Sequence, residues 1–135
     1  MPSSLPSGVP SRSDAAARYL QAATEANTRV ATARAAWVAG ATDLTRVRAG
    51  LLAVADAKER LDATVAAIRP PPGAVADVAT LLTADRALEA ALRAAANSTT
   101  AADLTALEPH MLDVGRAALD AANAVRRDLG LPPAP

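Results

Sequence analysis

The chain has 135 residues, a formal net charge of zero and no cysteine, and alanine makes up about 28% of it. This length is enough for one domain with a modest core, and the lack of cysteine excludes disulfides, thiolate metal sites and a thiol nucleophile. A balanced charge gives no overall field that would attract nucleic acid or an anionic membrane surface.

The first segment, 1–13, is rich in proline, serine and glycine, which is typical of a flexible linker. Ser13 or Asp14 is the expected N-cap of a first helix over 14–39. Gly40 supplies a stop signal at the carboxyl end of this helix.

Thr42 or Asp43 is placed to cap a second helix over 43–68. The run of three prolines and a glycine at 70–73 lacks the N–H groups that a helix needs, so it predicts a stiff turn. A third helix is expected over 74–96.

The polar run 97–100 predicts the next break and offers Ser/Thr N-caps for a fourth helix over 101–129. Pro109 lies inside this helix and is expected to kink or split it, because proline removes one backbone hydrogen bond. Gly130 ends the helix ahead of a proline-rich tail over 131–135.

Apolar residues recur in all four segments at alternating spacings of three and four, as in coiled coils. Short connections make consecutive helices antiparallel neighbours. The predicted fold is therefore all-α, an up-down-up-down antiparallel four-helix bundle over 14–130. Its core is thin because alanine buries little area, and Trp37 is expected to fill one end.

Two charged residues interrupt the apolar stripes: Lys58 in the second helix and Asp85 in the third. Folding the chain about its turns brings Asn27 and Arg116 to the same height, so the four residues are predicted to form one polar layer halfway along the bundle. Within this layer Lys58 and Asp85 are expected to form an ion pair.

Three interpretations of this layer stay open. It sets the alignment of the helices, as buried polar residues do in coiled coils. Alternatively, a slight rotation of the helices lets Lys58 reach solvent and leaves Asp85 at a solvated contact between helices. In the third interpretation, the layer lines a pocket for a small ligand or ion.

The sequence offers little for catalysis, and no catalytic residue, cofactor or metal site is predicted. His110 is the only histidine, so a surface position is expected for it. No phosphate-binding glycine loop or serine-hydrolase motif occurs. The other carboxylates, Asp62 and Glu89 among them, fall at spacings normal for solvated helix faces.

Three stretches carry a resemblance to a known group. The ending Ala124-Val125-Arg126-Arg127-Asp128-Leu129-Gly130-Leu131-Pro132-Pro133, the early Tyr19-Leu20 and Ala26-Asn27, and the segment 77–85 with 88–92 resemble uncharacterised exported lipoproteins of high-GC Gram-positive bacteria. The resemblance implies a helical domain held outside the membrane by a linker like 1–13. The chain has no lipid-bearing cysteine, so membrane contact is expected only through an N-terminal lipid anchor absent from this chain. The group brings no known activity.

These observations predict a non-enzymatic interaction or structural module, extracytoplasmic or otherwise cytoplasmic, and monomeric or dimeric. Its partner is expected to be an unidentified protein and not nucleic acid. The alternative is a small-ligand sensor that uses the mid-bundle polar layer. A mid-bundle pocket above about 300 Å³ lined by Lys58 and Asp85 favours the sensor. A dry core with exposed apolar side chains favours the interaction module.

Overall fold

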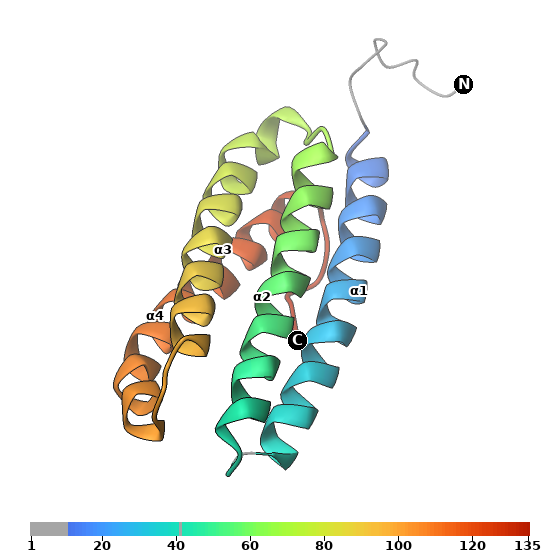
Figure 1. Cartoon of the computed structure of the whole chain (residues 1–135). Helices are drawn as coiled ribbons and strands as arrows, with labels where there is room; N and C mark the ends of the chain where they lie inside the picture. Colours follow the sequence, from blue (N-terminus) through green and yellow to red (C-terminus); the bar gives the residue numbers. More distant parts are fainter. Residues whose placement is uncertain (1–10, 41) are drawn as a thin grey trace, which may run out of the picture.

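The computed structural model describes residues 11–40 and 42–135, and all regular secondary structure within them is helical. Figure 1 shows the helices packed side by side along one elongated bundle. Their bounds are α1 Arg12–Ala39, α2 Leu44–Ala67, α3 Val75–Ala96 and α4 Ala101–Asp128, with a 3₁₀ turn η1 at Pro72–Ala74. The predicted all-α class and helical-bundle architecture are confirmed.

The predicted helix bounds agree with the observed ones to within two residues at each end. The N-cap of α1 was predicted wrongly: it is Ser11, and Arg12 and Ser13 belong to the helix. The rest of the predicted linker, 1–10, lies outside the described residues. Ser11, Asp43 and Thr100 each accept backbone N–H bonds from the first turn of their helices, which satisfies donors that a helix leaves free there. Pro109 does not split α4, which runs on through it.

The chain reverses direction directly after the carboxyl end of α4. Gly130 adopts a positive φ of 72°, and the N–H of Leu131 donates to the carbonyl of Arg126 over 2.8 Å, the hydrogen bond of a Schellman motif. Beyond it the tail returns along the helix, where the N–H of Ala134 donates to Oδ1 of Asn123 over 2.8 Å. Figure 1 shows the tail running back beside the helices in red.

Consecutive helices pack against each other along the chain, whereas α1 and α4 have little direct backbone contact. Where these two helices do meet, Nε of Arg12 donates to the carbonyl of Asp128 over 3.0 Å. Arg48 of α2 makes the same kind of bond to the carbonyl of Ala96 at the end of α3. Both arginines satisfy acceptors that a helix leaves free at its carboxyl end and complement the helix dipole there.

The buried apolar side chains form two clusters, one towards each end of the bundle. The larger members of the first core cluster are Tyr19, Leu61, Val65, Leu81, Val125 and Leu129. The larger members of the second core cluster are Val47, Leu51, Val54 and Leu92. Alanines fill much of the rest, so the helices come close together and each cluster is small. Trp37, predicted to fill one end, is half-buried against the second cluster.

Two glycines in helix interiors provide a matched test of how close this packing is. A Cβ on Gly50 would lie 2.9 Å from Cβ of Trp37, whereas a Cβ on Gly115 would meet only Cδ1 of Leu88, at 4.0 Å. We expect Gly115→Ala to stabilise the fold by about 1 kcal/mol through helix propensity. We expect Gly50→Ala to destabilise it by about 1–3 kcal/mol, because α1 and α2 must move apart. Urea unfolding followed by circular dichroism measures both, and equal stabilisation by the two substitutions would contradict the close contact at Gly50.

Candidate functional site

All four helices contribute a buried side chain with a polar group to one region of the core. These residues, which we call the polar cluster, are Tyr19 of α1, Asp62 of α2, Asp85 and Glu89 of α3, and Arg126 of α4. None exposes more than 9% of its surface, and Asp85 exposes 1%. The carboxyl groups lie where the two core clusters meet, so bulk water does not solvate them.

The local sequence explains why the three acids face each other. Asp85 and Glu89 are four residues apart in α3 and therefore share one helix face. Asp62 follows Leu61 on α2, which packs against both α1 and α3 and so buries a wide face. A residue beside the central stripe of α2 is consequently turned towards α3 instead of towards water.

When these acids are ionised, no hydrogen-bond donor faces their enclosed oxygens. Both oxygens of Asp62, Oδ2 of Asp85 and Oε1 of Glu89 are enclosed and make no hydrogen bond. An unpartnered carboxylate in a protein interior costs several kcal/mol, on the order of the whole stability of a small domain. The cluster therefore favours a state in which at least one carboxyl group holds a proton.

The pKa values point to Asp62 as the group that holds this proton. Burial raises the pKa of Asp62 to about 10, helped by the hydrogen bond that the protonated form donates to Asp85 and by the charges of Asp85 and Glu89. Burial also raises the pKa of Glu89, which a hydrogen bond from Asp62 partly offsets. A protonated Asp62 supplies the missing donor, because its O–H can bond to a facing carboxyl oxygen.

Arg126 supplies a buried positive charge beside Tyr19. Its guanidinium carbon lies 5.8 Å from the centre of the Tyr19 ring, within the range of a cation–π contact. One of its NH2 groups donates to the carbonyl of Pro132 over 3.3 Å, whereas its Nε has no acceptor. Burial raises the pKa of Tyr19, the Arg126 charge lowers it and the Asp85 charge raises it, so the hydroxyl lies within reach of both charges. Through the Pro132 carbonyl, the proline-rich tail therefore helps to hold the guanidinium group of Arg126.

The four residues of the predicted polar layer do not share one buried environment. Asp85 is buried, Lys58 is half-buried, and Asn27 and Arg116 are exposed. The predicted ion pair between Lys58 and Asp85 is wrong: within residues 11–40 and 42–135, the ion pairs are those of Arg46 with Asp43 and of Arg93 with Asp56 and Glu59.

The acids that accompany Asp85 were predicted to be solvated, and that prediction is also wrong. Asp62 and Glu89 are buried because each lies one position beside the apolar stripe, on the flank that turns towards a neighbouring helix. The spacing of four between Asp85 and Glu89 could have indicated that both side chains lie on the same buried helix face. The position of Arg126 gave a weaker indication of burial, since Arg126 directly follows Val125 of the apolar stripe in α4.

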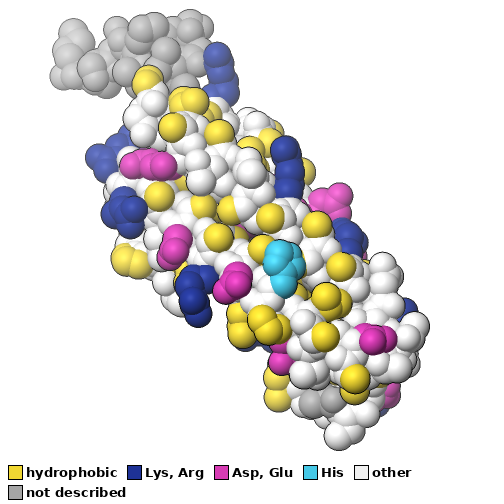
Figure 2. Space-filling model, turned by 90° about the vertical axis from the view of Figure 1, so that its left-hand side faces the viewer, with side chains coloured by type: hydrophobic (Ala, Val, Ile, Leu, Met, Phe, Trp, Pro, Cys, Tyr) yellow, Lys and Arg dark blue, Asp and Glu magenta, His cyan; other side chains and the backbone are white. Residues whose placement is uncertain are grey.

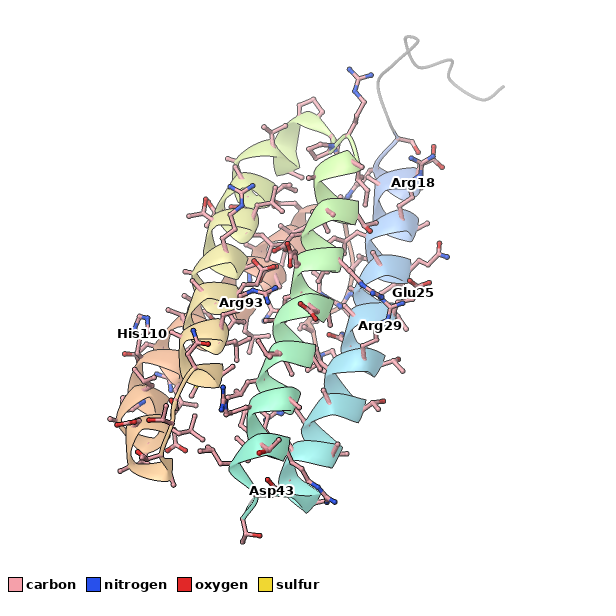
Figure 3. All side chains as sticks on the ribbon, in the orientation of Figure 1. Arg18, Glu25, Arg29, Asp43, Arg93 and His110 are labelled. Carbon is pink, nitrogen blue, oxygen red and sulfur yellow. The ribbon has the colours of Figure 1, made fainter. Side chains whose placement is uncertain are left out.

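His110 lies on the surface of α4, as expected (Figures 2 and 3). In the part of the chain that the structure describes, no group of three His, Asp or Glu side chains is arranged to hold a metal ion. Among the same residues, none of the helices combines the length and the apolar character of a membrane span. Comparison with protein-family models, with curated proteins and with solved structures finds no match to this chain.

The raised pKa of Asp62 predicts how stability depends on pH. The folded chain keeps this proton up to about pH 10, whereas the unfolded chain loses it near the ordinary value of 3.8. Between these values the folded state binds more protons, so its stability falls as pH rises. We expect Asp62→Asn to flatten this dependence and to be more stable than the parent at about pH 9 by about 1–2 kcal/mol.

The measurement is the free energy of unfolding from urea titrations at about pH 6 and about pH 9. Asp120→Asn is the matched control, since Asp120 is exposed on α4 and its replacement should leave the pH dependence unchanged. A parent-like pH dependence in Asp62→Asn would show that the cluster proton is not held there.

Proposed function

We propose that the chain is a non-enzymatic interaction module that binds a protein partner between α1 and α4. The observation that carries the proposal is an incompletely covered core on this side. No residue of α1 beyond Ala26 and none of α4 before Ala118 is fully buried. The half-buried apolar side chains there, which we call the seam, are Val30, Ala33, Trp37, Leu104, Leu107 and Met111.

The side of the bundle between α1 and α4 is closed near the start of α1 and open towards the other end. Near the start of α1, the bond from Arg12 to the Asp128 carbonyl and the contact of Arg126 with Tyr19 join α1 to α4. Towards the other end, the side chains of the seam cover the second core cluster but stay partly exposed themselves. Apolar side chains gathered on a surface in this way are typical of protein contacts.

We assign the polar cluster a structural role in this module. Its members are enclosed, and neither Lys58 nor Asp85 lines either of the two hollows described in this structure. Enclosed polar groups contributed by every helix disfavour any shift of one helix along another, since a shift would strand a charge. This supports alignment of the helices over the ligand-sensor alternative.

The proposal also takes the bundle as up-down-up-down and antiparallel, which the short connections between consecutive helices support. It places the module outside the cytoplasm, as the resemblance to exported lipoproteins implies. The exposed position of His110 on α4 supports a non-enzymatic role.

Site-specific photo-crosslinking in the source organism tests the proposal. We expect a benzophenone amino acid at Leu107, in the seam, to give an adduct of discrete size with a partner protein. The same amino acid at Leu119 is the control, because Leu119 is exposed on α4 but lies outside the seam. Equal adducts at both positions, or none at Leu107, would contradict binding at the seam, and an adduct of twice the chain mass would identify the partner as a second copy.

A further inference from the structure

A second surface feature lies on the pair α1 and α2, and it shares no residue with the seam. It is a groove of about 320 Å³. Its apolar floor consists of Ala22, Ala26, Ala57, Leu61, Ala67 and Ile68. Its polar rim consists of Arg18, Gln21, Glu25, Arg29, Arg60 and Thr64.

Small side chains create this groove. Ala26 and Ala57 are buried and Ala22 is half-buried, so methyl groups face each other where larger side chains would fill the space between the helices. The rim residues are exposed, and all of them except Thr64 have long side chains. The result is a hollow with an apolar base and polar edges, the usual composition of a small-molecule site.

The rim carries an excess of positive charge although the whole chain is neutral. Three guanidinium groups face a single carboxylate, that of Glu25, which leaves a formal charge of +2 around the groove. Within residues 11–40 and 42–135, none of these three arginines forms an ion pair, whereas Arg93 on α3 is paired with Asp56 and Glu59. Figure 3 shows Arg18, Glu25 and Arg29 spaced along α1.

We propose that this groove binds a free anionic amphiphile with a single alkyl chain, of the chemistry of a fatty carboxylate. The alanine, leucine and isoleucine floor removes the alkyl chain from water. The rim guanidiniums bind the head group, because arginine matches a carboxylate with two parallel hydrogen bonds. Arg18 and Arg29 are eleven residues apart on one helix, about 16 Å along its axis, so the groove is long enough for an extended chain.

Calorimetric titration with decanoate, below its critical micelle concentration, tests the proposal. We expect saturable binding that weakens as salt is added, since exposed charges contribute to it. Acetate lacks the chain and decyltrimethylammonium reverses the head-group charge, so neither should bind. Binding of the cationic amphiphile as tight as that of decanoate would overturn the assignment.

Four variants locate the site. Arg29→Gln and Arg60→Gln should each weaken decanoate binding about tenfold by removing a charged donor. Ala22→Leu should abolish binding by filling the floor without changing any charge. Arg34→Gln is the matched control, because Arg34 is exposed on α1 but does not line the groove. Thermal melts confirm that each variant is folded, and equal weakening by Arg34→Gln would overturn the proposal.

Two other occupants are distinguished by parallel experiments. An acidic amphipathic peptide that binds where decanoate does not would assign the groove to a helix of a protein. Concentration-dependent dimerisation lost in Ala22→Leu, together with no decanoate binding, would assign it to a second copy. Either result overturns the proposal. Neither result tests binding at the seam between α1 and α4, because crosslinking from Leu107 tests that surface separately.

Discussion

Three carboxyl groups enclosed between α2 and α3 set the central constraint on this fold. Asp62, Asp85 and Glu89 lie where the two core clusters meet, and as three bare anions they would repel each other without solvent. A proton on Asp62 relieves this repulsion. Because Tyr19 and Arg126 bring α1 and α4 into the same cluster, every helix depends on this arrangement.

Alanine-rich packing shapes both the core and the surface. Small side chains let α1 approach α2 so closely that Gly50 has no room for a Cβ beside Trp37. The same small side chains leave the groove on the outer face of this helix pair. The side chains of the seam, which pack against the second core cluster, stay half-exposed.

Helix bounds were predictable because Gly40, the prolines at 70–73 and the polar run 97–100 are local signals. The polar cluster was only partly predictable. Asp85 was recognised from its place in the apolar stripe, but a single stripe describes one contact line, whereas α2 and α3 each pack against two neighbours and bury a wider face. Lys58 therefore stays half-buried while Asp62, one position beside the stripe, is enclosed. Which flank of a helix is covered depends on how the helices rotate about their axes, and tertiary packing decides that rotation.

We expect one carboxyl group of the polar cluster to stay protonated at neutral pH in the folded chain. A direct test is an NMR titration of the side-chain carboxyl carbons, with Asp62 assigned by its loss in Asp62→Asn. We expect the Asp62 signal to keep the chemical shift of a protonated acid through neutral pH and to titrate only in the alkaline range. Titration of Asp62 near its ordinary value of 3.8, with the fold intact, would contradict it.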